Sequence, residues 1–421
     1  MRIMSTTRLL TFVLICLPLV AQAQLTLETC KQKAHDNYPA VKEYALIDAS
    51  RDYTLDNADK AWLPQVSVNG TGLAMTDLLT NNQQMKALGM DTKNLMASAS
   101  LMVNQKIYDG GQTAASKAVT RAETEVNRRN LDVNMYAINS RIEQLYFGIL
   151  LLDEQLKQNQ LLHDDLSINE RQVADMIKGG IANASDLDAV RVEVVRCEQN
   201  KASLSASRAA YLRMLGYFIG ESLPETTTLQ SVDTALSATD ADTVARPELL
   251  WYDAQQTLIS QQRKRLDTRL LPTVGAFGLG QAHSSLTSPT LLHNTFFSAG
   301  INISWNIGAL YTRKNDLKKL QVESDRIEAE RRTFLFNNRL QRDDAQGQIE
   351  SLRRQLELDD KVVSLRRSIY DKSMKKVRLG TETVNEMLRD AIAVSQASQQ
   401  QNLHRIQLQQ AIYQQKTILG L

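Results

Sequence analysis

The sequence predicts an internally duplicated α+β fold, in which each half contributes two β-strands and one long antiparallel helical hairpin. Two observations support the duplication and the hairpins. Landmarks of the first half return about 200 residues later, and apolar residues in the longest segments recur about every 3.5 residues. A third observation supports the strands, because short segments that follow a proline alternate polar and apolar residues. The chain should therefore combine rods of helix with a small sheet.

The chain begins with a stretch that has the three parts of a secretory signal. Arg2 and Arg8 give the positive start, residues 9–20 are apolar, and Ala21-Gln22-Ala23 is a cleavage site. We assign 1–23 to a signal peptide and expect the rest to be exported. No second run of 18 apolar residues follows, so an exported chain that enters a membrane must do so as β-strands.

Composition excludes several classes of protein. Lys and Arg total 49 against 47 Asp and Glu, which removes the electrostatic case for a nucleic-acid partner. Seven prolines and eighteen glycines are few for a loop-rich β-sandwich. Three cysteines exclude a disulfide-dense scaffold, and we expect Cys30 and Cys197 to be separate packing thiols.

The duplication is defined by landmarks at constant offsets. Pro64 returns 208 residues later as Pro272, and Gly180 returns 200 residues later as Gly380. An eight-residue difference in the loop between the two strands of each half explains the shift. We divide the chain into signal peptide 1–23, first repeat 24–219, linker 220–245 and second repeat 246–421.

Each half is expected to hold the same elements in the same order. These are a helix, a strand entered through a proline, a polar loop, a second strand, a very long helix, a glycine turn and a return helix. The first half places them at 39–62, 63–74, 75–97, 98–108, 112–178, 179–182 and 183–216. The second half places them at 247–270, 271–282, 283–295, 296–308, 312–378, 379–382 and 383–419. A helix over 112–178 would be about 100 Å long, and helix 39–62 is the natural partner for the part that the return helix leaves uncovered.

The long helices carry a coiled-coil pattern, with steps of four and three residues between apolar positions. The seam of the first half consists of Ile138, Ile142, Leu145, Ile149, Leu152 and Leu156. The seam of the second half consists of Leu358, Val362, Leu365 and Ile369.

The strand segments have two faces. Ile301, Ile303 and Trp305 alternate with Asn302 and Ser304. This alternation suits a membrane barrel strand as well as a half-buried strand of a soluble sheet. Four strands cannot close a barrel, and open edges are costly in lipid, so strands that span a membrane would require the chain to oligomerise.

Catalytic and metal-binding patterns are missing from the sequence. It has no G-x-S-x-G, no G-x-x-x-x-G-K-[ST], no C-x-x-C and no H-E-x-x-H, so we expect no enzyme activity, no cofactor and no bound metal. The five histidines are scattered: His35, His163, His283, His293 and His404. Only His283 and His293 lie near one polar loop, and they are better explained as loop residues than as ligands.

At this point the chain resembles the outer-membrane efflux protein (TolC) family over essentially its whole exported length. The resemblance rests on the duplicated plan, the Pro64 and Pro272 strand entries, and the strand exit Ile107-Tyr108-Asp109-Gly110-Gly111. It also rests on the glycine turns at Gly180 and Gly380, each followed six residues later by an acid. The second strand exit, Ile307-Gly308-Ala309-Leu310, departs from the Asp-Gly-Gly motif.

The resemblance implies an α+β membrane protein that assembles as a homotrimer. Its twelve strands would form one barrel in outer-membrane lipid, and its helices a coiled-coil tunnel across the periplasm. It would be the passive exit duct of a tripartite efflux or secretion system, opened by an inner-membrane transporter and a periplasmic adaptor protein. The alternative function is a periplasmic coiled-coil adaptor or scaffold, which would not need detergent.

The resemblance also implies a periplasmic gate at the helix tips, formed by the turns at Gly179, Gly180 and Gly380. Asp186 and Glu386 occupy the positions where acids line the closed mouth of the family's tunnel. Both acids could instead be ordinary helix caps, since 383–386 is a capping box and 183–186 nearly one. Arg389 stands where some members carry a second acid, and Glu382 where some carry a basic residue, so the contacts of the gate should differ.

Overall fold

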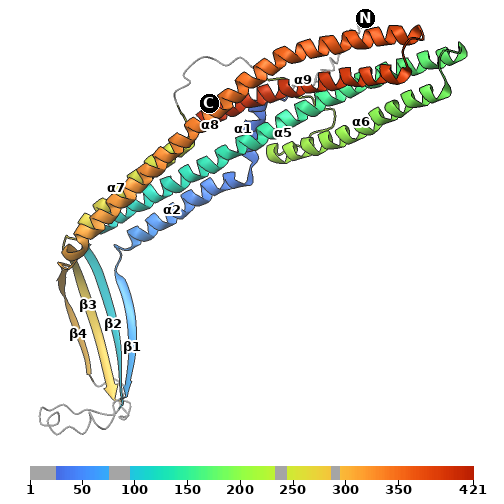
Figure 1. The fold of residues 1–421 in the computed structure, drawn as a ribbon. Coiled ribbons are helices and arrows are strands. Elements are labelled where there is room, and N and C mark those ends of the chain that lie inside the picture. The colour runs from blue at the N-terminus through green and yellow to red at the C-terminus, as the bar shows by residue number, and fades with distance from the viewer. Residues whose placement is uncertain (1–24, 75–94, 233–243, 286–293) are drawn as a thin grey trace, which may run out of the picture. The chain divides into compact units, whose positions relative to one another are not determined.

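The computed structural model describes residues 25–74, 95–232, 244–285 and 294–421. The expected signal 1–23, most of the first polar loop, most of the linker and His293 lie outside these residues. The helices are α1 Leu27–Asn37, η1 Pro39–Val41 (a 3₁₀ helix), α2 Lys42–Lys60, α5 Gln112–Lys178, α6 Ala184–Ile219, α7 Pro247–Thr268, α8 Ala309–Arg378 and α9 Val384–Leu419. The strands are β1 Gln65–Ala74, β2 Leu95–Tyr108, β3 Thr273–Ser285 and β4 Asn294–Ser304 (Figure 1).

The predicted fold class, four strands with two long helical hairpins, is confirmed. Within these ranges no helix has an 18-residue stretch apolar enough to cross a bilayer.

The chain forms two compact units, and each combines segments of both repeats. The hairpin unit consists of Met1–Asn37, Ile142–Ala235 and Leu352–Gln410, and it contains α1, α6, most of α9 and the later parts of α5 and α8. The sheet unit consists of Tyr38–Arg141, Leu236–Ser351 and Ala411–Leu421, and it contains the four strands, α2, α7 and the earlier parts of α5 and α8.

The sheet is antiparallel throughout, in the order β1-β2-β3-β4, so β1 and β4 are its edges. Its register assigns the side chains to two faces, because residues that are paired across strands point to the same face. The apolar face carries Val66, Val68, Leu101, Val103, Val274, Ala276, Phe297, Ala299, Ile301 and Ile303. The opposite face carries most of the polar side chains, namely Ser67, Asn69, Thr71, Ser98, Ser100, Gln281, Ser298 and Asn302, together with the apolar side chains of Met102, Phe277, Leu279 and Phe296.

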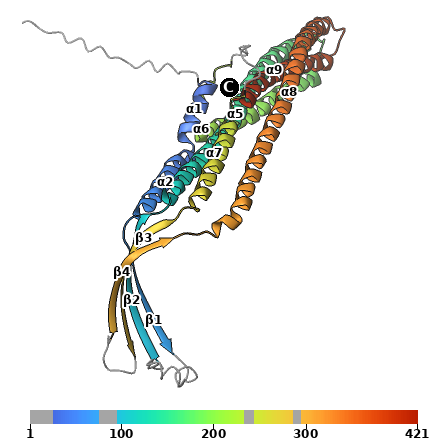
Figure 2. The same cartoon turned by 90° about the vertical axis from the view of Figure 1, so that its left-hand side faces the viewer.

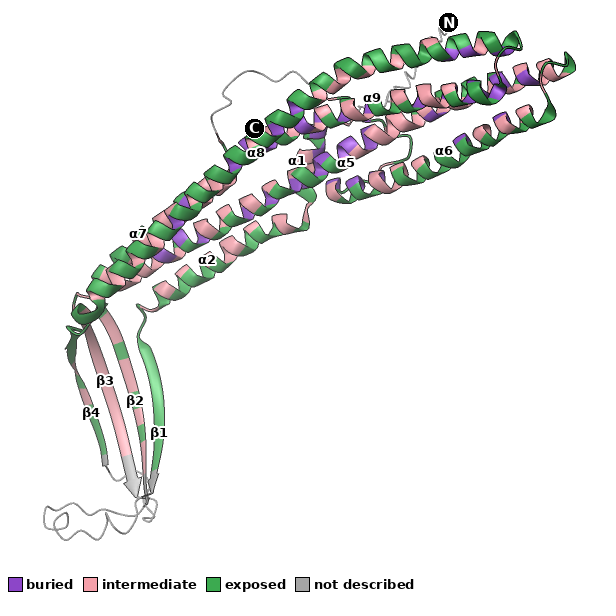
Figure 3. Ribbon diagram, viewed as in Figure 1, coloured by how far each residue is buried: buried purple, intermediate pink, exposed green. Residues whose placement is uncertain are grey.

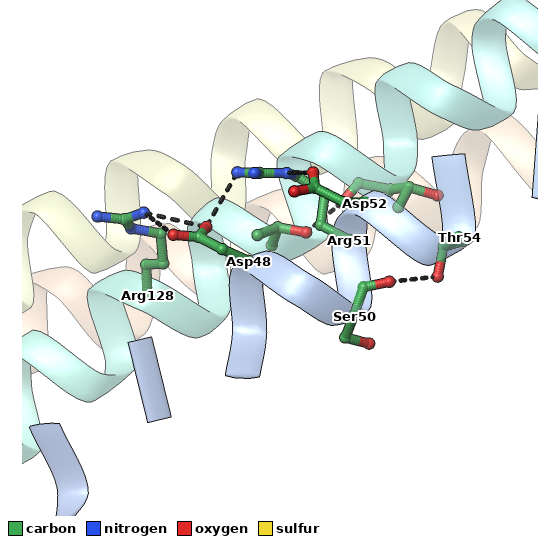
Figure 4. Close-up of polar contacts among 8 residues, drawn as sticks. Asp48, Ser50, Arg51, Asp52, Thr54 and Arg128 are labelled. Carbon is green, nitrogen blue, oxygen red and sulfur yellow. Dashed lines mark hydrogen bonds and ion pairs between the residues drawn. The ribbon is translucent and has the colours of Figure 1, made fainter. Parts of the chain in front are cut away.

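Helix α2 packs along the early part of α5 through charged and polar contacts. The Asp48 carboxylate accepts from Arg51 at 2.9 Å and from Arg128 of α5 at 2.8 Å (Figure 4). The Tyr44 hydroxyl donates to Asp132 of α5 at 2.6 Å. The helix before β1 is therefore the partner that the sequence predicted for this stretch of the long helix.

The hairpin unit contains the four hairpin helices α5, α6, α8 and α9 (Figure 2), and all four contribute buried residues to its core (Figure 3). Its buried members are Leu166, Val173, Val190, Cys197, Tyr370, Val377, Val384, Met387, Leu388 and Ala391. Within this core Asn169 of α5 donates to the Tyr370 hydroxyl of α8 at 2.9 Å. Apolar packing and one buried hydrogen bond thus join the α5/α6 hairpin to the α8/α9 hairpin.

The two predicted seams differ in the structure. In the first half Ile138, Ile142 and Ile149 are at most 5% exposed, as expected of a seam. In the second half the stripe from Leu358 to Ile369 is helical but exposed. The buried face of α8 lies on other residues, among them Ile349.

Helix α1 is an element that the sequence analysis missed. Leu27, Cys30 and Ala34 are its buried residues, with the three- and four-residue spacing of a helix face. The side chain of Asn37 donates to the Ile219 carbonyl at 2.9 Å, and Lys33 pairs with Glu221 at 2.7 Å. These contacts hold α1 against the end of α6.

The second strand-to-helix junction corrects two predicted boundaries. Helix α8 begins at Ala309 rather than 312, and β4 ends at Ser304 rather than 308. In the first repeat Asp109 accepts from the N–H groups of Gly111 at 2.9 Å and Thr113 at 2.8 Å, which fixes the start of α5. Gly110 and Gly111 have φ angles of 65° and 79°, which keep them out of the helix. The second repeat has Ala309, Leu310 and Tyr311 in the places of Asp109, Gly110 and Gly111, so its helix can begin three residues earlier.

Candidate functional site

The two hairpin turns have the same backbone geometry. Gly180 and Gly380 have φ angles of 73° and 71°, which L-residues with a Cβ rarely adopt. The Gly380 N–H donates to the Val377 carbonyl and the Thr381 N–H to the Lys376 carbonyl, both at 3.0 Å. The same pair of bonds closes α5 around Gly180. Each long helix therefore ends in a Schellman motif.

The return helices begin with matched capping boxes. The Asp186 N–H donates to the Asn183 side chain at 3.1 Å, and the Asn183 N–H donates to the Asp186 carboxylate at 3.0 Å. The Glu386 N–H donates to the Thr383 hydroxyl at 3.2 Å, and the Thr383 N–H donates to the Glu386 carboxylate at 3.0 Å. Both predicted acids thus lie on the first turn of a return helix, and their capping role is present.

The surroundings of the second acid are basic. Hydrogen bonds from the Thr383 N–H and hydroxyl lower the pKa of Glu386, and the charges of Arg389 and Lys376 lower it further. Both Glu386 and Arg389 are exposed. Arg389 also lines a groove of about 610 Å³ whose wall includes Glu193 and Arg366. It therefore acts on Glu386 through its charge while facing this groove.

Glu382 belongs to the turn itself. Its carboxylate accepts from the Ser373 hydroxyl at 2.7 Å and pairs with Lys376 at 3.3 Å. These contacts link the α8/α9 turn to the last turns of α8. The acid at this position therefore has a local structural partner.

The tips of the two hairpins lie side by side. A Cβ placed on Gly380 would be 3.8 Å from the Cγ2 atom of Ile181. Arg378 donates to Gln172 at 3.2 Å, which joins α8 to α5 near the same end. The first turns of α6 and α9, with their two acids, are therefore brought to one end of the hairpin unit.

The predicted strand entries lie where the sheet meets the helices. Pro64 directly precedes β1, and Pro272 directly precedes β3. Close to these junctions the structure exposes four aromatic side chains: Trp62, Tyr108, Trp305 and Tyr311. The sequence analysis named Tyr108 and Trp305 only as parts of strand patterns and did not name Trp62 or Tyr311. Their closeness to the strand ends is the feature of the sequence that could have identified them.

His404 and His163 lie on different helices and have different neighbours. His404 of α9 bonds to Asp359 of α8 at 2.6 Å, and His163 lies 3.5 Å from the neighbouring Asp164. In the part of the chain that the structure describes, no three His, Cys, Asp or Glu side chains form a group that could hold a metal ion.

Comparison with known proteins identifies the fold. No protein-family model and no curated protein matches the sequence. Among solved structures, the CmeC outer membrane channel of Campylobacter jejuni is 14% identical, with a TM-score of 0.65 over 94% of this chain and 85% of that one. The open state of the MtrE outer membrane channel of Neisseria gonorrhoeae is 12% identical, with a TM-score of 0.63 over 94% of this chain and 88% of that one. CusC, described in terms of folding and transmembrane channel formation, is 14% identical, with a TM-score of 0.68 over 93% of this chain and 91% of that one. At these identities the likeness establishes a common fold.

Proposed function

We propose that this chain, which has the fold of the outer-membrane efflux channels, is the passive exit duct of a tripartite efflux or secretion system. It would act as a homotrimer in the outer membrane, with its long helices in the periplasm. The observation that carries the proposal is the sheet, which has one apolar face, a second face that carries most of its polar side chains, and two open edges.

The sheet suits a boundary between lipid and water. Val68, Ile301 and Ile303 are about three-quarters exposed on the apolar face, a costly arrangement in water and a favourable one against acyl chains. The opposite face offers hydroxyl and amide groups to a water-filled lumen. Because the edge strands β1 and β4 leave backbone groups unpaired, lipid would require them to pair with other copies. Three copies give twelve strands, the number that the family resemblance implies.

The exposed aromatic residues fit the same placement. Trp62, Tyr108, Trp305 and Tyr311 lie where the strands meet the helices. Aromatic girdles of membrane barrels occupy the interface between lipid and water. We therefore place the periplasmic surface of the outer membrane at this level of the sheet unit.

A passive duct has no energy source of its own, so the proposed function requires partner proteins. An inner-membrane transporter would supply the energy, and a periplasmic adaptor would join it to the hairpin tips. No catalytic step and no cofactor is required of this chain. The alternative, a periplasmic adaptor or scaffold, would leave the exposed apolar face of the sheet without an environment.

The test is to locate and size the protein. Membranes should be separated by density, and the purified protein should be weighed in detergent and added to planar lipid bilayers. We expect an outer-membrane protein of three chains that conducts ions. A protein released in the periplasmic extract without detergent would support the scaffold and contradict the duct.

We also propose that Asp186 and Glu386 narrow the mouth of the duct. The support is their matched place on the first turns of α6 and α9, at one end of the hairpin unit. Copies of these acids around a symmetry axis would repel one another and attract cations. Arg389 would moderate the charge near Glu386, as its effect on the Glu386 pKa indicates.

The gate is tested with Asp186→Asn combined with Glu386→Gln, which removes two negative charges per chain and keeps side-chain size. Conductance in planar bilayers should lose much of its sensitivity to divalent cations, in a protein that is still oligomeric at the temperature of the measurement. The matched control is Asp175→Asn with Asp371→Asn, two exposed acids on α5 and α8 away from the caps. If the gate variant is blocked by divalent cations as the parent is, the two acids are helix caps only.

A further inference from the structure

The ends of α7 and α8 that join the sheet lie side by side. Arg313, near the start of α8, pairs with Asp267 in the last turn of α7 at 2.7 Å. The indole N–H of Trp305, between β4 and α8, donates to the Leu270 carbonyl at 2.9 Å. The end of α7 and the start of α8 therefore meet β3 and β4 at one end of the sheet (Figure 1).

The chain is strongly basic at this junction. Residues 254–272 and 305–322 hold eight lysines and arginines but only two acids. One of these acids, Asp267, is already paired with Arg313. Four exposed cations, which we call the basic patch, lie within five residues of the two helix ends, or about 8 Å along the helix axis. They are Arg263, Lys264, Arg269 and Lys314.

The corresponding junction of the first repeat is not basic. Its equivalent segments, 46–64 and 105–122, hold five basic and five acidic residues. Lys117 pairs there with Asp59 at 2.6 Å. The fold therefore does not require positive charge at this level. Because crowded like charges repel one another, the charge of the second repeat indicates an anionic partner outside the chain.

The basic patch lies at the level of exposed aromatic residues. Trp305 directly follows β4, Tyr311 belongs to the first turn of α8, and they are 61% and 85% exposed. Aromatic residues favour the interface between membrane and water, where long basic side chains extend their charged ends to the headgroups. The surface potential of anionic lipids acts within one Debye length, about 10 Å at 0.1 M salt. The four cations are within that distance of the junction.

We propose that the basic patch binds the phosphate headgroups of anionic phospholipids, such as phosphatidylglycerol, in the periplasmic leaflet of the outer membrane. The inference rests on the proposed function, which puts this junction at the membrane surface. The guanidinium groups of Arg263 and Arg269 can each present two parallel N–H donors to a phosphate, and Lys264 and Lys314 add compact positive charges. Each copy of the chain would therefore hold anionic lipid beside its second repeat and show no such preference beside its first.

Tryptophan fluorescence in vesicles reports the lipid that lies beside the patch. The chain has three tryptophans, and Trp62→Phe with Trp251→Phe leaves only Trp305, which contacts the end of α7. This form is reconstituted in phosphatidylcholine vesicles that contain brominated phosphatidylcholine or brominated phosphatidylglycerol, because bromine quenches a tryptophan in contact with lipid. We expect the binding constant obtained from quenching to favour phosphatidylglycerol by about fivefold or more at about 0.1 M salt. The preference should shrink at about 1 M salt, where the Debye length falls to about 3 Å.

The first repeat supplies a control within the same molecule. Trp251→Phe with Trp305→Phe leaves Trp62, which lies at the junction between α2 and β1. Because the charges of this junction balance, the two brominated lipids should quench Trp62 alike. A phosphatidylglycerol preference of the same size at Trp62 would show that the effect is not local to the basic patch.

Charge removal tests the cations themselves. The patch variant, which should lose the preference at Trp305, combines Lys264→Gln, Arg269→Gln and Lys314→Gln. The control variant, which should keep it, removes equal charge from exposed positions of α8 in the hairpin unit with Arg354→Gln, Lys361→Gln and Lys372→Gln. If the patch variant does not fold, the comparison of lipids and of salt concentrations in the Trp305 form still decides the proposal.

The outcomes separate the lipid site from the duct. Equal quenching of Trp305 by both lipids, or a preference that the patch variant keeps or the control variant also loses, overturns the lipid site and leaves the duct standing. A patch variant whose oligomer dissociates in lipid-free detergent overturns it too, in favour of a contact between chains. Loss of the preference when inorganic phosphate is added at constant ionic strength overturns it in favour of a soluble phosphate group. A protein that is a single chain in detergent overturns the duct itself, and the lipid site with it.

Discussion

Glu386 and Thr383 bond each other in both directions, with the Thr383 N–H 3.0 Å from the Glu386 carboxylate and the Glu386 N–H 3.2 Å from the Thr383 hydroxyl. Asp186 and Asn183 repeat this arrangement in the other hairpin. The cap fixes the first turn of each return helix. It therefore also fixes the position from which each carboxylate would act on a passing ion.

The cap makes the stability contribution of Glu386 depend on pH. Its pKa in the folded chain is below the ordinary glutamate value of 4.5, so the contribution is present above that value and is lost as the pH falls through the lowered pKa. Glu386→Gln should melt at a lower temperature than the parent at neutral pH, and the difference should vanish in acid. Circular dichroism melts across this range measure it. A difference that persists in strong acid would show that the charge is not responsible.

The turn at Gly179 and Gly180 offers a matched pair of substitutions. Only Gly180 has a positive φ, so Gly180→Ala should destabilise the α5/α6 hairpin by about 1–2 kcal/mol. Gly179→Ala should be neutral or slightly stabilising, since its Cβ would meet nothing closer than 3.6 Å. Thermal unfolding in detergent compares them. Equal effects of the two variants would contradict the assigned turn geometry.

The cap at Asp109 should matter more than its exposed counterparts, because this side chain is 4% exposed. Asp109→Ala leaves the N–H groups of Gly111 and Thr113 without acceptors and should cost about 0.5–2 kcal/mol. Asp109→Asn keeps one acceptor oxygen and should lose less. Thermal denaturation should give the highest melting temperature for the parent, a lower one for Asp109→Asn and the lowest for Asp109→Ala. An alanine variant as stable as the parent would exclude a capping role.

Adjacent residues of β2 test which face of the sheet meets lipid. Leu101 lies on the apolar face and Ser100 on the polar face. A lysine on the lipid side of a barrel costs about 2–4 kcal/mol near the middle of the bilayer, so Leu101→Lys should impair insertion and lower the dissociation temperature of the oligomer. Ser100→Lys should insert normally. If both variants reach the outer membrane equally well, the apolar face is not against lipid.

The regular parts of the fold could be predicted from the sequence because their signals are local. The seam around Ile142 and the glycine at 180 predicted α5 to the residue. Helix α1 was missed because its apolar positions, such as Cys30 and Ala34, occupy only three turns. The early start of α8 accompanies the loss of the Asp-Gly-Gly motif in the second repeat, where Leu310 and Tyr311 replace two glycines of positive φ.

The candidate site could be predicted only in part. The spacing from Gly180 and Gly380 placed Asp186 and Glu386 on first turns, and the structure adds that both caps are complete. Spacing could not say that the stripe at Leu358 is exposed in the chain, because a heptad pattern carries no information about which helix, if any, covers it. Contacts of Arg389 were equally hidden, since they depend on the groove that three helices build.

The open edges of the sheet also constrain how the protein can be made. In the proposed duct, each newly made chain would carry two unsatisfied strand edges and an apolar face, so in lipid it could not complete its sheet alone. Completion of the barrel would then be an encounter reaction whose rate rises steeply with the concentration of unassembled chains. Biogenesis would have a slow phase at low expression, during which the free strands of β1 and β4 are the sites most open to wrong pairing or to protection by a chaperone.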